Sequence, residues 1–389
     1  MRILCTTIPA FTHTAALVPL AQAAQLAGHE VIFAGGGVTL KVAAEAGLPV
    51  LDAAPGQDVT APYRRCMEIM AKEDLPGDQA QGVFVGATAE IGDMMLPGLV
   101  DAARGWGVDV VLYPPFLPWA QLAAHAAGAF GVMHGIGFRF PAVPWWATEP
   151  SEVVRRHGVT EFPAHPDAEV SLGVDSLERF NPRSPGEVPF PVFPVRPCSY
   201  NGSGQVPPWV LRRASRARIA VTMGNTSDDS SWAEVLRAIV EGTADLDAEL
   251  ALTSGGVDLS PIIGQLPERV RVVDFVPMSN LLPRCDALIH HAGMGTTYAA
   301  LAAGVPQVAL RPNKGDAPLN AHVMSSRGAG IAVDRSEATP EAIGKALREV
   351  LQVPSYRTAS EEVAAEMAEM PTPQDVVGQL AEMAQSRTR

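Results

Sequence analysis

Apolar residues in the first forty positions follow the order of a strand, a helix and a second strand. A short apolar run at residues 3–5 precedes a turn-like segment, and the next apolar side chains share one helical face: Leu17, Leu20, Ala21 and Ala24. Their spacing of i, i+3, i+4 and i+7 predicts an amphipathic helix. Gly28 is placed to end this helix, and residues 31–34 form a second apolar run before a triple-glycine loop. The pattern predicts a βαβ unit, which is the start of a doubly wound parallel sheet.

The same pattern begins again near residue 217. Residues 218–223 are strand-like, residues 224–227 are turn-like, and a second apolar stripe repeats the helical spacing at Trp232, Val235, Leu236 and Ile239. Between the two starts, residues 182–208 are rich in Pro and Gly, which is typical of a linker. A chain of 389 residues is long for one domain. We therefore expect two α/β domains.

Strand-like and helical segments alternate through the second half of the chain. Further apolar runs, each followed by a turn or a helix, lie at residues 250–252, 270–275, 287–289 and 305–310. Thr339 and Pro340 suit the N-cap and first position of a helix, and the tail predicts two more helices, at residues 355–370 and 373–384. Residues 60–100 and 135–180 are poorly periodic, so their element boundaries do not follow from the pattern.

Composition and charge narrow the class of protein. Hydrophobic residues make up 47% of the chain and charged residues 18%, which favours folded cores over disorder. The net charge of −13 argues against binding to nucleic acid or to an anionic membrane, because both require clustered Lys and Arg. Polar residues interrupt the apolar run near the N-terminus, so we predict neither a signal peptide nor a membrane span. Four scattered cysteines predict reduced thiols in the cytoplasm: Cys5, Cys66, Cys198 and Cys285.

Neither of two common nucleotide-binding motifs supports its usual function in this chain, since one is missing and the other lies in an unsuitable place. The first βα turn, residues 7–13, has no GxGxxG, so it lacks the glycines that let a backbone approach a dinucleotide pyrophosphate, and an NAD enzyme is disfavoured. A DxD, Asp245 to Asp247, is the pattern with which GT-A transferases hold manganese. It stands just before a predicted strand in a chain with two βα starts. We interpret it as a solvated turn.

The strongest chemical motif is the segment His290-His291-Ala292-Gly293-Met294-Gly295-Thr296-Thr297, between a predicted strand and a predicted helix. Glycines let a backbone approach an anion, amides at a helix start point toward it, and Thr and His side chains add hydrogen bonds. The motif indicates a diphosphate cradle. From these eight residues alone, a glycine-rich turn with a structural histidine stays open. Adjacent histidines project in different directions, so a metal-chelating pair is disfavoured.

An ordered set of motifs in the second half resembles the donor site of family 1 glycosyltransferases, and most of all the actinomycete enzymes that attach deoxysugars to antibiotic polyketides. The set consists of residues 274–277, 281–283, 285–286, 290–297, 303–307, Asp316, residues 320–321 and residues 328–331. Pro19 and residues 28–31 agree with it. The resemblance implies a GT-B fold, with two Rossmann-like doubly wound parallel-sheet domains facing a cleft. It places the acceptor domain at 1–205, the donor domain at 216–355, and helices at 356–389 that return to the first domain.

The same resemblance implies roles for individual donor-site residues. Phe275 stands where the family stacks an aromatic ring on the nucleotide base, with the backbone of Val276 beside the base edge. The expected diphosphate ligands are His291, Gly293, Gly295, Thr296 and, after the first strand of the second domain, Thr226. Asp316 stands where a carboxylate binds the sugar hydroxyls, and Asn320 belongs to the same motif set. The leaving diphosphate would then need no metal ion.

His13 falls where the family keeps a catalytic histidine, at the end of the first predicted strand. An imidazole with an ordinary pKa near 6.5 suits a base that removes the proton of an acceptor hydroxyl. The family's orienting aspartate has no counterpart in residues 112–116, and Glu90 or Asp93 could replace it only if the fold brings them near. Two further departures are Ala299, in place of a ribose-binding glutamate, and Ala317, in place of a sugar-binding amide.

These observations predict a cytoplasmic, inverting glycosyltransferase that moves a deoxysugar from a dTDP-sugar to a small hydroxylated natural product. The nucleotide sugar is a co-substrate, and no cofactor, metal ion, nucleic acid or membrane is expected as a partner; a homodimer is left open. An apolar acceptor pocket and a core are equal interpretations of eight residues: Met67, Met70, Met94, Met95, Phe138, Phe140 and the pair at 145–146. Two alternatives are a GT-B-shaped nucleotide-sugar epimerase and a non-catalytic accessory protein.

Overall fold

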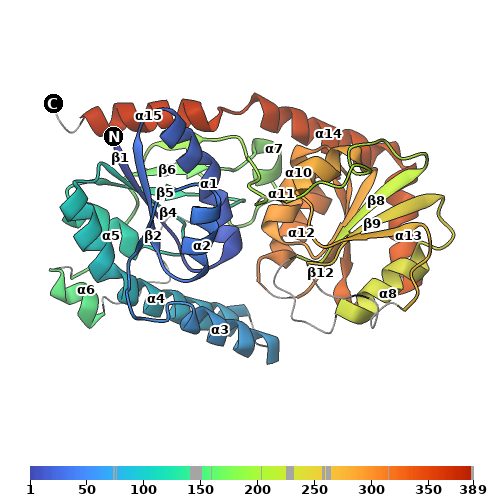
Figure 1. Cartoon of the computed structure of the whole chain (residues 1–389), viewed down its shortest axis with the longest axis horizontal. Helices are drawn as coiled ribbons and strands as arrows, with labels where there is room; N and C mark the ends of the chain where they lie inside the picture. The colour runs from blue at the N-terminus through green and yellow to red at the C-terminus, as the bar shows by residue number, and fades with distance from the viewer. Residues whose placement is uncertain are drawn as a thin grey trace. The chain divides into compact units, whose positions relative to one another are not determined.

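The computed structural model describes residues 1–72, 75, 77–140, 151–158, 160–202, 204–224, 232–255, 259, 264–313 and 315–386. Contacts between residues divide the chain into two compact units. Unit 1 comprises residues 1–173, 183–202 and 370–389, and unit 2 comprises residues 174–182 and 203–369. Each unit is built on its own parallel sheet (Figure 1).

Unit 1 contains a seven-stranded sheet in the order β3-β2-β1-β4-β5-β6-β7. Its strands are β1 (Arg2–Thr6), β2 (Glu30–Gly35), β3 (Val50–Asp52), β4 (Val110–Tyr113), β5 (Phe130–His134), β6 (Ala168–Ser171) and β7 (Val192–Pro194), and every pairing is parallel. The chain builds outward from β1 to β3 and then crosses back, so that β4 lies on the other side of β1. Such a reversal leaves a crevice at the carboxyl ends of the two central strands, where ligands of doubly wound sheets bind.

The helices of unit 1 cover this sheet. They are α1 (Phe11–Leu26), α2 (Val38–Glu45), α3 (Ala61–Lys72), α4 (Gly77–Trp106), α5 (Trp119–Ala126), α6 (Glu152–Arg156) and α15 (Pro373–Ser386). The long helix α4 supplies core side chains at Ile91, Met95, Leu96, Leu99, Val100 and Ala103. Gly98 permits this packing, because a Cβ there would stand 2.1 Å from the backbone oxygen of Ala53. By length and composition, α4 is the one described helix that could cross a membrane, but here it forms part of the core.

Unit 2 contains a six-stranded parallel sheet in the order β10-β9-β8-β11-β12-β13. The strands are β8 (Ala217–Thr222), β9 (Ala248–Thr253), β10 (Val270–Val273), β11 (Ala287–His290), β12 (Gln307–Arg311) and β13 (Gly330–Asp334). The order reverses again, this time between β8 and β11. Both units therefore have one crevice-forming reversal next to their first strand.

Alternating residues of the second sheet pack into two separate cores. Ile219, Val221 and Ile289 face one core, and Ala220 and Leu288 face the other. The covering helices are α7 (Asp175–Glu178), α8 (Trp232–Gly242), α10 (Met278–Leu281), α11 (Met294–Ala302), α12 (Ala317–Ser326), α13 (Pro340–Gln352) and α14 (Pro354–Glu369), with 3-10 turns at Leu282–Arg284 and Arg335–Glu337. Burial on both faces explains why these strands are continuously apolar in sequence.

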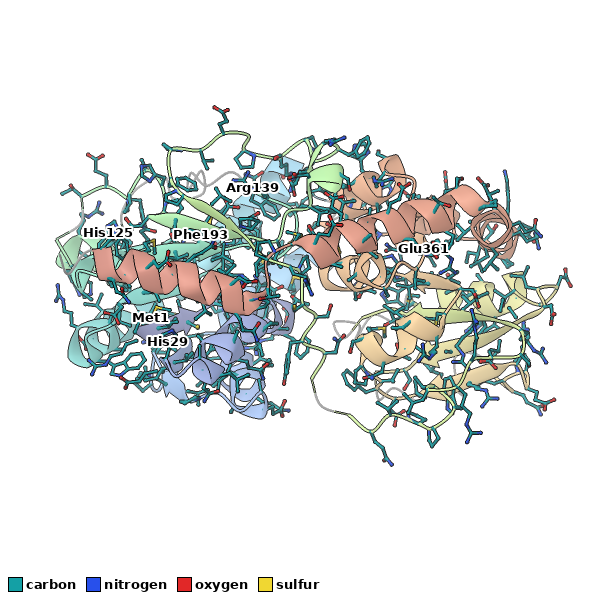
Figure 2. All side chains as sticks on the ribbon, turned by 90° about the horizontal axis from the view of Figure 1, so that it is seen from above. Met1, His29, His125, Arg139, Phe193 and Glu361 are labelled. Carbon is teal, nitrogen blue, oxygen red and sulfur yellow. The ribbon has the colours of Figure 1, made fainter. Side chains whose placement is uncertain are left out.

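The two terminal helices belong to different units. Helix α15 packs against α1 and β7, whose Phe193 is labelled in Figure 2. Helix α14 packs against α11 of unit 2, where Val363 and Met367 are buried and the Ser360 hydroxyl donates to the Ala329 carbonyl at 3.3 Å. This differs from the expectation that the whole tail, 356–389, returns to the first domain. The segment 174–182 also differs, since α7 packs against α12 of unit 2.

The predicted architecture of two parallel-sheet Rossmann-like domains is confirmed. The strand expected at 287–289 runs one residue further and includes His290, and the helix after β1 begins at Phe11, so His13 lies in its first turn. Asp245 and Asp247 lie exposed in the turn before β9, as the solvated-turn interpretation expects. The segment 60–100, whose element boundaries did not follow from the pattern, contains α3 and most of α4, which ends at Trp106.

Candidate active site

His13 lies at the strand-order reversal of unit 1. It is the third residue of α1, which follows β1 after a short connection and has no side-chain cap at its N-terminus. The imidazole is half-buried, and its ring meets the ring of Phe116 edge-on with the centroids 5.6 Å apart. Phe116 lies three residues beyond β4, the neighbouring strand at the reversal. The fold therefore brings the candidate base to the place where doubly wound sheets bind ligands.

The environment of His13 keeps its imidazole neutral. Its Nδ1 atom is buried and has no hydrogen-bond partner among the described residues. Burial lowers the pKa of His13 to about 4, because a desolvated imidazole is less readily protonated. A neutral imidazole is the form that accepts a proton.

The two carboxylates considered as orienting partners for His13 are bound elsewhere. Glu90 receives two hydrogen bonds from Arg65, at 2.8 and 2.7 Å. Asp93 accepts hydrogen bonds from the Trp119 indole at 2.7 Å and from the Ser151 hydroxyl at 2.6 Å. Within the described ranges, no carboxylate forms a hydrogen bond with His13.

A set of aromatic rings begins beside the candidate base, because Phe116 contacts both the His13 ring and two further Phe rings. Phe116 makes edge contacts with Phe84 of α4 at 5.2 Å and with Phe140 at 5.3 Å between centroids. We call these three rings and the His13 ring the aromatic cluster. Of the residues considered for an apolar acceptor pocket, Phe138 and Met95 are fully buried core residues, whereas Phe140 contacts Phe116. Trp145 and Trp146 lie outside the described residues. Sequence reasoning missed Phe84 and Phe116, since neither lies in a recognisable motif.

His291 lies at the strand-order reversal of unit 2, directly after β11. Two glycines enclose its ring: a Cβ at Gly224, after β8, would stand 2.8 Å from Cε1, and a Cβ at Gly293 would stand 2.3 Å from Nε2. No larger residue fits at either position without moving the ring. Burial lowers the pKa of His291, and the nearby Asp316 carboxylate and Thr222 backbone partly oppose this.

Helix α11 begins inside the glycine-rich motif. Gly293 is its N-cap and offers no side-chain cap, and no acidic residue stands in the first turn. The amides at the start of such a helix have no partner within the helix and carry partial positive charge. Gly295 is exposed and Thr296 half-buried, so the backbone here is open to an anion. The geometry suits a diphosphate.

Asn320 anchors this loop through hydrogen bonds of its side-chain amide. Its Nδ2 donates to the Ala292 carbonyl at 2.8 Å and to the Asp316 carboxylate at 3.0 Å, and the side chain is fully buried. Ala292 needs this support because its φ of 62° is a left-handed conformation, which alanine rarely adopts. Asn320 thus contacts the loop and Asp316, the N-cap residue of α12, rather than an open surface.

The candidate base-stacking ring, Phe275, is 38% exposed although it is large and apolar. A Cβ at Gly204 would stand 2.8 Å from its Cδ1 and 3.2 Å from its Cε1, with the next nearest atom, in Pro277, at 3.8 Å. Gly204 therefore borders the edge of the ring. Val276 is buried, as are Ala299 and Ala317. Thr226 lies outside the described residues, and Gly204 and Gly224 carry no motif that sequence reasoning could have used.

Two doubly wound parallel sheets, each with a candidate site at its strand-order reversal, are the architecture expected of a GT-B glycosyltransferase. Residues 22–224 match the N-terminal domain model, and residues 237–383 the C-terminal domain model, of the erythromycin biosynthesis protein CIII-like proteins. The chain belongs to this family, which confirms the resemblance to antibiotic glycosyltransferases, and it is an enzyme of that class.

Individual relatives match over nearly their whole length. The elloramycin glycosyltransferase ElmGT of Streptomyces olivaceus is 33% identical, over 98% of this chain and 97% of its own. The crystal structure of the glycosyltransferase SnogD from Streptomyces nogalater is similar with a TM-score of 0.81 and 33% identity, and each chain is 99% covered. The spinosyn rhamnosyltransferase SpnG, complexed with thymidine diphosphate, has a TM-score of 0.80 and 25% identity, with 98% of this chain and 100% of that chain covered.

Proposed function

We propose that this glycosyltransferase transfers a deoxysugar from a dTDP-sugar to a hydroxyl group of a small natural-product aglycone of the polyketide type, with inversion at the anomeric carbon. The observation that carries the proposal is the His291 ring held between Gly224 and Gly293 at the start of α11. A diphosphate bound there meets an imidazole and uncapped helix amides together. The thymidine diphosphate complex of SpnG and the names of the antibiotic glycosyltransferases support the donor and the acceptor class.

Each residue then has a defined task. His13 takes the proton of the acceptor hydroxyl, the acceptor oxygen bonds to the anomeric carbon, and the bond from that carbon to the diphosphate oxygen breaks. His291, Gly293, Gly295 and Thr296 stabilise the negative charge that develops on the leaving diphosphate. Thr226 stays a predicted further phosphate ligand.

Three more residues bind the rest of the donor. Phe275 stacks on the base beside the backbone of Val276, and Asp316 binds a hydroxyl or amino group of the sugar. Asn320 holds Asp316 and the loop in place through its two hydrogen bonds. No metal ion or resident cofactor takes part in this scheme, since groups of the chain carry the diphosphate charge. We place the reaction in the cytoplasm, which suits four free cysteines; a homodimer stays a prediction.

Incubation with dTDP-L-rhamnose tests the proposal against its two alternatives. We expect no change in the sugar without an acceptor, and release of dTDP when an aromatic polyketide aglycone is added. An epimerase would convert the sugar without any acceptor. A non-catalytic accessory protein would neither convert the sugar nor release dTDP, although the binding of dTDP would still raise its melting temperature.

A further inference from the structure

The aromatic cluster around His13 bears on the acceptor, and this inference rests on the proposed function. We propose that the acceptor hydroxyl is a phenol carried on a flat aromatic ring system. Two independent features lead to this substrate class: the lack of a carboxylate bonded to the base within the described residues, and the aromatic cluster that begins with Phe116 beside the base.

The first feature concerns the proton. In a histidine with a carboxylate partner, the carboxylate orients the ring and stabilises the imidazolium that forms when the proton arrives. The buried Nδ1 of His13 has no such partner in the described part of the chain, and Glu90 and Asp93, the two acids considered as partners, bind Arg65, Trp119 and Ser151 instead. Proton uptake is therefore poorly supported, and the base is suited to a hydroxyl that gives up its proton readily.

A phenol meets this requirement and an aliphatic alcohol does not. Phenolic hydroxyls have a pKa of about 10, as in tyrosine, whereas the pKa of water, a guide to unactivated hydroxyls, is several units higher. Proton transfer is most effective when donor and acceptor differ little in pKa. Burial, which lowers the pKa of His13 to about 4, widens the mismatch with an aliphatic alcohol further.

The second feature concerns shape. Phe84, Phe116 and Phe140 come from three different segments, and their rings meet edge to face at 5.2 and 5.3 Å between centroids. Rings in this arrangement attract a further aromatic ring, stacked or edge-on, more strongly than a saturated one of equal size.

The segment that carries Phe140 is held in place by an ion pair. Arg139, labelled in Figure 2, donates two hydrogen bonds to the buried Glu169 of β6, at 2.9 and 2.7 Å. Phe138, on the other side of Arg139, is fully buried. The position of Phe140 beside Phe116 is therefore supported by its two preceding residues, and a rigid set of rings favours a rigid aromatic acceptor.

The acceptor pair 2-naphthol and 2-decalol tests both features, because the two molecules share a carbon skeleton and differ in aromaticity and hydroxyl acidity. With dTDP-L-rhamnose as the donor, we expect kcat/KM to be at least about 100-fold higher for 2-naphthol. Equal rates, or faster transfer to 2-decalol, would overturn the proposal and leave the glycosyltransferase function standing.

Equilibrium binding in the presence of dTDP gives a second answer that needs no turnover. We expect 2-naphthol to bind at least about tenfold tighter than 2-decalol. We also expect Phe116→Leu to weaken the binding of 2-naphthol and to leave the binding of 2-decalol unchanged. Phe162→Leu is the matched control, because Phe162 contacts Trp119 at 5.2 Å and none of the cluster rings in the described contacts. Equal binding of the two acceptors, or equal effects of the two Leu variants, contradicts the proposal. Failure of dTDP to bind would instead contradict the proposed function.

Discussion

The two strand-order reversals of this enzyme carry opposite kinds of chemistry. At the reversal of unit 1, one imidazole meets the ring of Phe116, which contacts two further Phe rings, and no described carboxylate bonds to the imidazole. At the reversal of unit 2, an imidazole stands between two glycines, beside uncapped helix amides and a carboxylate held by Asn320. The same fold feature thus supports an apolar site in one unit and a polar site in the other.

The difference teaches how one fold can keep its donor chemistry and vary its acceptor. A diphosphate has the same charge and shape in every nucleotide sugar, so its ligands gain from fixed positions. The left-handed Ala292 is such a fixed position, stabilised by the Asn320 hydrogen bond at 2.8 Å. The proposed acceptor side consists mainly of packed rings, which residue changes can reshape without leaving polar groups unsatisfied.

Removal of the base should have the largest effect. We expect His13→Ala to lower turnover by about two orders of magnitude or more and to leave dTDP binding unchanged, since a general base contributes roughly 10²- to 10⁴-fold. The loss should shrink with more acidic phenols such as 4-nitrophenol. Because burial lowers the pKa of His13 to about 4, wild-type activity on 2-naphthol, whose hydroxyl stays protonated in this range, should show no His13 titration between pH 6 and 8. Activity of His13→Ala within about threefold of wild type on 2-naphthol contradicts the assignment.

Removal of the other imidazole should affect binding instead of proton transfer. His291→Ala should weaken dTDP about ten- to a hundredfold, because a hydrogen bond to a charged group contributes roughly 1.5 to 3 kcal/mol. Thymidine, which lacks the diphosphate, should bind as before. Isothermal titration of both ligands distinguishes the roles, since an equal loss for the two would mean that His291 has only a structural role.

A change at Gly293 tests whether the glycine serves the histidine. Its backbone φ of −68° suits any residue, so the effect of Gly293→Ala comes from its Cβ, 2.3 Å from the His291 ring. We expect dTDP to bind about tenfold more weakly in the single variant. In a protein that already carries His291→Ala, the same change should cost little, because the ring it displaces is gone. Equal losses in the two backgrounds would show that the glycine acts on the ligand directly.

Much of the fold could be predicted because, after each of the two first strands, apolar residues repeat with the spacing of the helix that forms there. Leu17, Leu20, Ala21 and Ala24 are buried in α1, and Trp232, Val235, Leu236 and Ile239 are buried in α8. Helix α4 was missed because no residue of its N-terminal turns, 79–86, is fully buried, and because Pro97 stands inside the stripe of its second half. Its packing is set by tertiary contacts such as Gly98 against Ala53.

The candidate sites were predictable where they consist of local motifs. The motif at 290–297 is one continuous segment, and it lies where the sequence predicts it, at the junction of β11 and α11. Contacts between distant segments gave no signal, which is why Phe84, Phe116, Gly204 and Gly224 were missed. The buried hydrogen bond from Asn320 likewise depends on α12 lying next to the loop, and residue spacing alone cannot show that contact.

A substitution at the edge of the proposed nucleobase site, within unit 2, should have a smaller effect on nucleotide binding. Gly204→Val should place a branched side chain against the Phe275 ring edge, where even a Cβ stands 2.8 Å away. Base stacking on an aromatic ring contributes roughly 1 to 3 kcal/mol, so partial loss should weaken thymidine and dTDP alike by about fivefold. Inorganic pyrophosphate should bind unchanged. Gly378→Val, at a helix glycine with open space around it, is the control for a general cost in stability.

The smallest expected effect is the choice between dTDP and UDP. A carboxylate at position 299 would accept hydrogen bonds from ribose hydroxyls, which Ala299 cannot do, so the loss of a hydroxyl in 2′-deoxyribose should cost this enzyme little. Ala299 packs in an apolar cluster with Val276 and Leu288, so nothing polar there is left unsatisfied by a deoxy donor. We therefore expect dTDP to bind at least as tightly as UDP. Ala299→Glu should shift the ratio of the two affinities toward UDP by about three- to fivefold, and Ala299→Leu, which adds bulk without an acceptor, should leave the ratio unchanged. The carboxylate must reach past the apolar cluster to the ribose, so both ligands will bind more weakly in absolute terms, and only the ratio is diagnostic. A wild-type preference of tenfold or more for UDP would contradict the dTDP assignment and would leave the roles of His13 and His291 untouched.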